Sequence, residues 1–471
     1  MVMKLVWLRR DLRSVDNTAL NHAIATSQEV VACFVATPSQ WRDHHMAPMQ
    51  ADLIARRLAV LAEELNALNI PLLYDEVDDY AQSATRVASW AEQLAVSEVV
   101  FNREYEVNER VRDEQLINQL ASSEIGVLDV EDKCVQAPGC VLNKQGDYFK
   151  VFTPFKKAWL KSFVPPQIIK TSAAQPVVLP EELQSSLWHE QAPFSYPRES
   201  SEAWSVDSQQ IRETLRRFCH EEVDRYHEQR DFPATAGTSV LSPYLAIGAI
   251  SVRQCIARLY WQQSYLSNGR EVWLSELIWR EFYHHLIHFE PKLVKGQGFV
   301  EWEKHLLWPA KPDWFERWCR GETGYPIVDA AMRQLNQTGW MHNRLRMIVA
   351  SFLTKDLHVN WRLGEQYFMQ KLVDGDFAAN NGGWQWCAST GCDGQPYFRI
   401  FNPITQGEKF DPNGEFVKHW LPELAQVPSK FVHQPWSWPG HMQLDYPAPM
   451  VDHKQEREIT LSLYTQAKDC L

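Results

Sequence analysis

The first 130 residues alternate between short apolar runs and longer stretches in which apolar residues recur every three or four positions. The apolar runs predict buried strands at 3–8, 30–35, 70–74, 98–101 and 126–130. The stretches between them predict helices, most clearly at 49–68, 80–96 and 105–121. This alternation predicts a parallel α/β sheet, doubly wound with helices on both faces, over residues 1–130. Such a sheet usually binds a ligand at the carboxyl ends of its strands.

The pattern changes twice after this predicted domain. Residues 131–205 are rich in Pro, Ser and Gln and have a sustained helical period only near 151–163. They predict a long surface linker with one helix. From 206 to 471 amphipathic helical stretches dominate, so we predict an all-α second domain there.

Composition narrows the class of protein. With 471 residues, 45% of them hydrophobic, the chain can bury a sizeable core in two or three domains. No apolar run reaches bilayer-spanning length and the start, MVMKLVWLRRDLR, lacks the features of a secretory signal, so we expect a cytoplasmic protein without membrane contact. The nine cysteines form no CxxC pair, which favours reduced thiols and no metal site.

The net charge of −12 bears on nucleic-acid binding. It argues against a protein that coats nucleic acid through overall basicity. Any DNA contact would therefore need a local basic face.

The helical stretch 273–289 has an unusual polar face. Opposite an apolar stripe, at spacings i, i+3, i+4 and i+7, it carries Glu276, Trp279, Arg280 and Tyr283. One interpretation is a solvent-exposed face with a Glu276–Arg280 ion pair. The other is the wall of a binding cleft, where large aromatics lie beside a carboxylate. The periodicity leaves both open.

Two later stretches have a similar composition. The stretch 340–353 predicts a helix whose polar face carries Trp340, Asn343, Arg344 and Met347. It could equally be an ordinary helix with basic surface residues. The stretch 374–383, DGDFAANNGG, places two carboxylates and a pair of amides before a predicted glycine turn. It lacks the ligands and spacing of an EF-hand.

Missing motifs limit the chemistry. The chain has no G-x-S-x-G elbow, no H-E-x-x-H and neither of the common glycine-rich nucleotide fingerprints. Hydrolysis by a nucleophile or a metal therefore has little support. Side chains of Trp, Asn, Arg, Glu and Met suit the stacking of a flat ligand, with the difficult step left to a cofactor.

Several long motifs, in order, resemble the cryptochrome/photolyase family, and most of all its bacterial class I cyclobutane pyrimidine dimer photolyases. They lie at 7–20, 105–113, 230–251, 276–286, 324–353 and 374–386. The resemblance implies a monomer that binds damaged DNA, duplex or also single-stranded. In that family a light-excited reduced FAD gives an electron to a flipped-out dimer, the cyclobutane ring splits, and the electron returns.

The resemblance also implies residue roles in the helical domain. Asn380 would bind flavin N5, Glu276 the base edge of the dimer, and Trp279 and Trp386 its faces, with Arg344 and Met347 completing the pocket. Trp384, Trp361 and Trp308 would form an electron-transfer chain to the flavin. The implied FAD contacts are Tyr226, Thr238, Ser239, Val240, Leu241, Ser242, Trp273, Arg280, Trp340, Asn343, Arg346, Asp374, Gly375 and Asp376.

Two further sets of contacts follow from the resemblance. A methenyltetrahydrofolate antenna would lie near His44, Asn108, Glu109 and Lys295, although Val294 stands where the family pattern has a cysteine. The implied DNA contacts are Lys156, Arg230, Glu276, Trp279, Asn343, Arg344, Arg399 and Gln406.

The main alternative is a cryptochrome-type blue-light sensor without repair activity. Retention of Glu276, Trp279, Asn380 and Trp386 favours repair instead. A six-four photolyase would be expected to carry a histidine near position 347, where this chain has Met347. The single-strand-preferring DASH cryptochromes typically differ at Arg344 and Met347.

Overall fold

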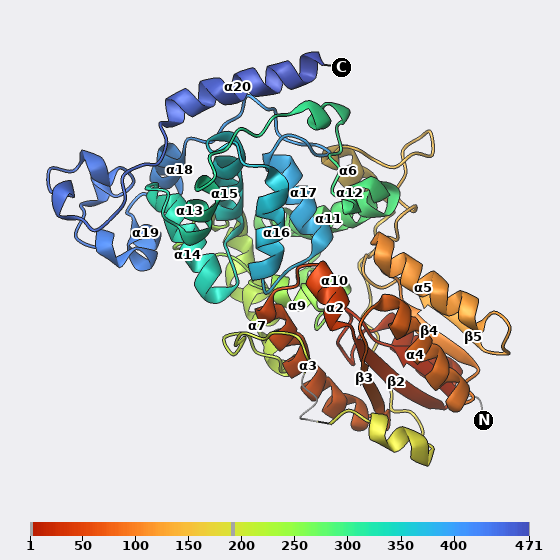
Figure 1. Cartoon of the computed structure of the whole chain (residues 1–471). Coiled ribbons are helices and arrows are strands. Elements are labelled where there is room, and N and C mark those ends of the chain that lie inside the picture. The colour runs from red at the N-terminus through yellow and green to blue at the C-terminus, as the bar shows by residue number, and fades with distance from the viewer. Residues whose placement is uncertain (1–2, 190–193, 471) are drawn as a thin grey trace.

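The five predicted strands form one parallel sheet in the computed structural model, which describes residues 3–189 and 194–470 (Figure 1). The outermost positions of the expected domains, 1–2 and 471, lie outside the described residues. The sheet order is β3-β2-β1-β4-β5. The strands are β1 (Met3–Trp7), β2 (Glu29–Ala36), β3 (Leu72–Glu76), β4 (Glu98–Asn102) and β5 (Gly126–Val130).

Alternating side chains along β1 explain why both faces of the sheet are covered. Leu5 and Trp7 pack into one apolar cluster with helices α4 and α5. Val6 points the other way and packs with α1 and α3. The predicted doubly wound α/β arrangement is confirmed. The helices of this part are α1 (Thr18–Thr26), α2 (Pro38–Asp43), α3 (Pro48–Asn66), α4 (Tyr80–Gln93) and α5 (Val107–Leu120).

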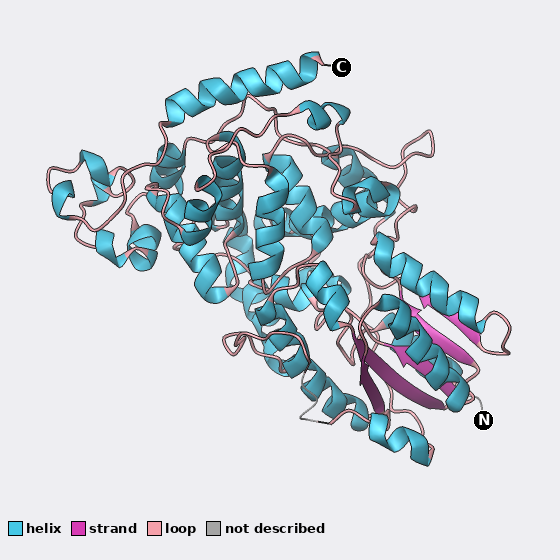
Figure 2. Ribbon diagram, in the orientation of Figure 1, coloured by secondary structure: helices cyan, strands magenta, loops and turns pink. Residues whose placement is uncertain are grey.

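The segment after β5 crosses from one half of the molecule to the other and back (Figures 1 and 2). It first forms α6 (Phe152–Ser162), where the Trp159 indole donates to Glu281 of the helical half at 2.6 Å. It then returns along the sheet, where the backbone N–H of Trp188 donates to Leu72 at 2.8 Å.

The rest of the described chain is helical, as predicted (Figure 2). Its apolar residues form a second large cluster around the central helices α14 to α17. Short 3-10 turns separate several of the elements. The α-helices are α7 (Ser208–Arg217), α8 (Tyr226–Gln229), α9 (Ser242–Ala246), α10 (Val252–Tyr260), α11 (Asn268–Phe289), α12 (Pro291–Val294), α13 (Trp314–Arg320), α14 (Pro326–Thr338), α15 (Asn343–Lys355), α16 (Trp361–Lys371), α17 (Phe377–Cys387), α18 (Pro403–Phe410), α19 (Glu415–Trp420) and α20 (His453–Asp469).

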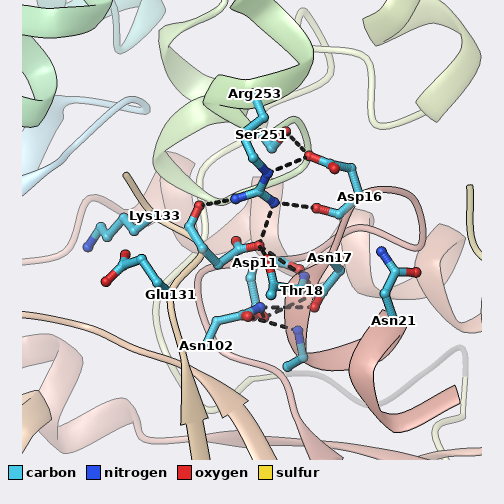
Figure 3. Close-up of polar contacts among 12 residues, drawn as sticks. Asp11, Asp16, Asn17, Thr18, Asn21, Asn102, Glu131, Lys133, Ser251 and Arg253 are labelled. Carbon is cyan, nitrogen blue, oxygen red and sulfur yellow. Dashed lines mark hydrogen bonds and ion pairs between the residues drawn. The ribbon is translucent and has the colours of Figure 1, made fainter. Parts of the chain in front are cut away.

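A buried polar network joins the two halves (Figure 3). Arg253 of α10 donates to Asp16 at 3.0 Å and to Asp132 at 2.7 Å, both in the α/β half. Burial alone would raise the pKa of Asp132, but the guanidinium groups of Arg13 and Arg253 hold it below its ordinary value. These hydrogen-bonded ion pairs therefore connect the two halves directly at this interface.

Glycine is required where the halves come closest. Gly248 has φ +70°, and a Cβ there would lie 2.2 Å from the carbonyl oxygen of Arg10. Any larger residue would push the halves apart. Among the described residues, no helix has the length and apolar character needed to span a bilayer.

Candidate functional site

A cavity of about 490 Å³ opens in the helical half between α11, α15 and α17. This size is typical of sites for small molecules and cofactors. The predicted residues that line it are Tyr226, Arg230, Thr238, Ser239, Ser242, Trp273, Glu276, Trp279, Arg280, Asn343, Arg346, Met347, Asp374, Asp376, Asn380, Trp384 and Trp386.

Other predicted residues lie beside the cavity without lining it. Arg344 donates to Asp231 at 2.8 Å and stacks over the Phe410 ring at 4.4 Å. The Trp340 indole donates to Ser242 at 3.3 Å. Val240, Leu241 and Gly375 are likewise outside the lining.

Sequence reasoning missed the apolar part of the lining. Leu277, Ala350, Phe368 and Leu372 line the cavity with Tyr283. The four apolar side chains carry no signal that separates them from ordinary core residues. Tyr283 was already on the polar face predicted for 273–289.

The polar face of α11 lines this cavity, so its interpretation as a solvent-exposed face with a Glu276–Arg280 pair is wrong. Glu276 instead accepts a hydrogen bond from Arg230 at 2.5 Å. Arg280 donates to the backbone carbonyl of Lys133 at 2.9 Å. The cleft interpretation is confirmed.

Trp279 is held in place by a residue of the predicted linker. Its indole stacks on Phe152 of α6, with ring centroids 3.6 Å apart and an interplanar angle of 9°. Phe152 therefore covers one face of the Trp279 indole. This stacking fixes the orientation of the ring, and the rest of its surface borders the cavity.

The predicted glycine turn after Asn381 is wrong, because Gly382 and Gly383 lie inside α17. Asp376 precedes the helix, and its side chain caps it by accepting from the N–H of Ala379. A Cβ at Gly382 would lie 2.2 Å from the ring of Tyr283, so α17 packs directly against α11. Gly383 has open space where a Cβ would be, and it lines the cavity.

Two carboxylates give the cavity a buried negative charge. Asp374 pairs with Arg346 at 2.8 Å through one oxygen, and its other oxygen is buried without a hydrogen-bond partner in the described chain. The His284 ring lies 3.4 Å from Asp376. Burial opposes ionisation of Asp376, yet His284 and the cation Lys133 hold its pKa well below the ordinary value.

Asn380 is oriented by the neighbouring helix. Its Nδ2 donates to the backbone carbonyl of Glu365 in α16 at 2.9 Å. The amide oxygen is therefore left as an acceptor on a side chain that lines the cavity. Asn381, the next residue, donates to the Glu365 side chain at 2.7 Å.

The three tryptophans expected to conduct electrons belong to one apolar cluster. Trp361 and Trp384 are buried in it, and Trp308 packs at its edge, half-buried. A Cβ at Gly364 would lie 2.1 Å from the Trp384 ring, so this glycine lets the indole pack against α16. Trp318, which sequence reasoning missed, is also buried in the cluster.

The expected antenna residues come together only in part. Asn108 and His44 are joined by a side-chain contact of 2.8 Å, and Glu109 accepts from the hydroxyl of Tyr80 at 3.0 Å. Lys295 follows α12, and no hydrogen bond or ion pair within the described residues joins it to the other three.

Burial sets the charges of this cluster. Burial and the nearby Arg10 lower the pKa of His44 to about 4. The His44–Glu109 contact of 3.8 Å is therefore no ion pair at neutral pH. Burial and the neighbouring Glu106 raise the pKa of Glu109 to about 7.

The remaining expected DNA contacts lie on surface elements of the helical half and on α6. Lys156 donates to Ser275 at 2.5 Å. Arg399 is exposed on the segment between α17 and α18, and Gln406 is half-buried on α18.

Cys134, Glu281 and His285 form a buried group with ligand atoms close enough to hold a metal ion. However, Glu281 accepts hydrogen bonds from the backbone N–H of Val135 and from the indole of Trp159. His285 contacts the carbonyl of Gln136. The group thus fastens the linker to α11, since its carboxylate is already occupied.

Comparison with known proteins places these features in a family. The family described as "DNA photolyase" matches residues 4–176, and the "FAD binding domain of DNA photolyase" matches residues 273–466. A relative from Vibrio cholerae, named deoxyribodipyrimidine photo-lyase, is 59% identical over 99% of this chain and 100% of its own. One of the same name from Escherichia coli is 48% identical over 99% of both chains.

Solved structures agree. The crystal structure of a class III photolyase from Agrobacterium tumefaciens superposes with a TM-score of 0.88 and 34% identity, over 100% of this chain and 98% of that one. The full-length identity to curated relatives and the two matching family regions lead to one conclusion. This chain belongs to the photolyase/cryptochrome family and has the family's FAD-binding helical domain.

Proposed function

We propose that the chain is a lyase that repairs cyclobutane pyrimidine dimers in DNA, driven by light absorbed by reduced FAD. The observation that carries this proposal is one cavity in which the carboxylates just before α17 and the amide of Asn380 meet the indoles of Trp279 and Trp386. The family relationship supports the same activity, and no feature of the described residues favours a sensor without repair.

The cavity residues fit FAD. Asp374 has a buried carboxylate oxygen without a partner, which a ligand donor can satisfy. Gly383 leaves open space at the cavity wall. Thr238 and Ser239 would hold the pyrophosphate, and Arg346 pairs with Asp374 and holds its side chain in place. When bound, FAD supplies the light-driven electron that opens the dimer and receives it back afterwards.

Asn380 contributes a fixed acceptor. Because its NH₂ group is bound to the carbonyl of Glu365, its oxygen can accept a hydrogen bond only from the cavity side. A reduced flavin carries a proton at N5 and an oxidised flavin does not. Asn380 therefore favours the reduced, active cofactor.

The dimer would bind between Trp279 and Trp386 after leaving the DNA helix. Flipping a damaged base costs a few kcal/mol, and stacking on an indole returns about 1–3 kcal/mol per base. Glu276 would accept a hydrogen bond from the base edge. Its partner Arg230 donates to the carboxylate at 2.5 Å and would bring a positive charge to the phosphate backbone.

The DNA face would combine Arg230 and Arg344 at the cavity with Lys156, Arg399 and Gln406 around it. The acidic remainder of the chain repels DNA, so affinity should depend steeply on salt. We propose that the protein acts as a monomer in the cytoplasm.

We propose methenyltetrahydrofolate as the antenna, held by His44, Asn108 and Glu109. The support is the joined, part-buried arrangement of these three residues. Val294 in place of the family's cysteine argues for weaker retention of the antenna, as does Lys295, which has no hydrogen bond or ion pair to the other three in the described part of the chain.

The test is photorepair by the purified protein. After anaerobic reduction, the enzyme is illuminated with blue light beside a duplex that contains one thymine dimer, and the return of thymine absorbance is followed. Repair in light and none in the dark is expected. A protein that holds flavin but restores no thymine would contradict repair and favour a light sensor.

A further inference from the structure

Lys355, at the end of α15, is a fully buried lysine in the helical half. Its ammonium group donates to the hydroxyl of Ser389 at 2.9 Å and to the backbone carbonyl of Arg399 at 3.1 Å. Within the described residues it has no carboxylate at ion-pair distance. The neighbouring Asp356 pairs with His453 instead.

Burying an ammonium group without a carboxylate is costly, because the charge leaves water for neutral acceptors. Burial accordingly lowers the pKa of Lys355 to about 8, so the group still carries its charge at neutral pH. An apolar side chain of similar length would fill this space at less cost. The presence of a lysine here is therefore best explained by the roles of its two acceptors, Ser389 and the backbone of Arg399.

The two acceptors lie at opposite ends of one segment, residues 389–399. Ser389 follows α17 three positions after Trp386 and has φ +59°, where the chain leaves the helix axis. Arg399 lies shortly before α18.

Between the two acceptors, α17 holds only the first part of the segment. Gln395 donates from its backbone to Trp386 and from its side chain to Cys387. In the part that carries Arg399, Tyr397 stacks on Tyr464 and the N–H of Phe401 donates to Ser351 at 3.5 Å, but the contact to Arg399 itself comes from Lys355.

We propose that Lys355 is a positioning residue that fixes Arg399 relative to Trp386, so that Arg399 meets the DNA backbone when a dimer occupies the cavity. This inference rests on the proposed function, in which Arg399 is a DNA contact. Lys355 itself touches neither DNA nor flavin, since it is buried behind the segment.

A purely structural role makes a different prediction. Thr460 of α20 donates to the carbonyl of Lys355, and Tyr464 donates to the carbonyl of Ala388 at 2.7 Å. If Lys355 only held these elements together, its loss would lower thermal stability and FAD content. It would not act selectively on DNA binding.

A double-mutant cycle separates the two roles. Lys355→Met, Arg399→Ala and the double variant are compared in the dark for the Kd of a duplex with one thymine dimer. We expect Arg399→Ala to weaken binding by about five- to tenfold. Lys355→Met should weaken it by a similar factor, and the double variant by no more than about twofold beyond Arg399→Ala. If the double variant instead weakened binding by the product of the two single factors, the inference would be overturned.

The salt dependence supplies a second measure. Loss of one phosphate contact lowers the slope of log Kobs against log salt by about 0.9. The slope for Lys355→Met should fall by the same amount as the slope for Arg399→Ala. The KM for repair by Lys355→Met should rise, and its kcat should stay within about twofold of wild type. A wild-type slope in Lys355→Met would overturn the inference, as would an Arg399→Ala variant with unchanged Kd.

Ser389→Ala keeps the inference testable if Lys355→Met does not fold. It removes one acceptor and leaves the lysine in place. We expect Kd to rise by about two- to threefold with FAD content unchanged. An unchanged Kd would count against the inference. Photorepair by the wild type tests the proposed function separately, so failure of one does not imply failure of the other.

Discussion

The indole rings of Trp318 and Trp384 meet edge to face, with centroids 6.1 Å apart. Trp384 lines the cavity, and Trp318 is buried in the apolar cluster behind it. Phe368 packs against Trp384 at 5.0 Å. Trp318 is therefore an aromatic neighbour of Trp384 on the side away from the cavity, and it offers an alternative to the expected route through Trp361 and Trp308.

Trp384→Phe should stop photoreduction of oxidised FAD, because phenylalanine is far harder to oxidise than an indole. Repair by chemically reduced enzyme should stay within about twofold of wild type, since the residues that we propose to stack on the dimer are Trp279 and Trp386. Bleaching of the flavin absorbance under blue light measures the first quantity, and thymine recovery measures the second. Equal loss of both would contradict separate roles.

Trp318→Phe is the matched comparison. If electrons travel through Trp361 and Trp308, this variant keeps most of its photoreduction rate because its aromatic packing is retained. A rate as low as that of Trp384→Phe would instead assign the route to Trp318. The same bleaching measurement distinguishes the two outcomes.

Arg346→Ala should release FAD. It leaves the buried Asp374 without its cation at 2.8 Å, and an unpaired buried carboxylate is strongly destabilising. We expect FAD affinity to fall by at least about tenfold, or 1.4 kcal/mol. The ratio of flavin to protein absorbance after dialysis reports it. Asp374→Asn, which removes the charge but keeps the shape, should retain more flavin; less flavin than in Arg346→Ala would contradict the argument.

Trp279→Ala should weaken binding of dimer-containing DNA by about 1–3 kcal/mol, the range found for stacking of a base on an aromatic side chain. Binding of undamaged duplex should change little, because an unflipped base does not reach the cavity. Competition binding in the dark measures both. Trp261→Ala, which removes an indole that is 60% exposed elsewhere on the surface, is the control and should alter neither.

Glu365 gives a prediction for pH. Burial raises its pKa from 4.5 to about 7, although the hydrogen bond from Asn381 opposes the shift. The folded state then holds this proton more tightly than the unfolded state does. The contribution to stability is complete below about pH 4.5 and is lost as pH rises through 7.

Glu365→Gln keeps an acceptor for Asn381 and removes the ionisation. Relative to wild type, the variant should therefore gain thermal stability between pH 5 and pH 8.5. Melting temperatures across this range test the sign, and a difference that stays constant with pH would contradict it.

The periodicity of the sequence was sufficient for the α/β sheet and for the polar face of α11, since both follow from local patterns of apolar residues. The glycine turn failed because propensity is local. Position 382 lies inside the helix and must be glycine because Tyr283, distant in the sequence, occupies the space that a Cβ would take. The support of Trp279 by Phe152 and of Arg399 by Lys355 could not be predicted, because each depends on segments brought together only by the fold.

The shared ion pairs between the two halves make this chain hard to divide. Arg253 lies in the helical half, and both of its carboxylate partners lie in the other. A fragment cut in the linker would leave the Arg253 guanidinium without a carboxylate on one side and Asp16 without Arg253 on the other, while Asp132 would keep only Arg13. Each half therefore depends on the other to balance the charges at its boundary.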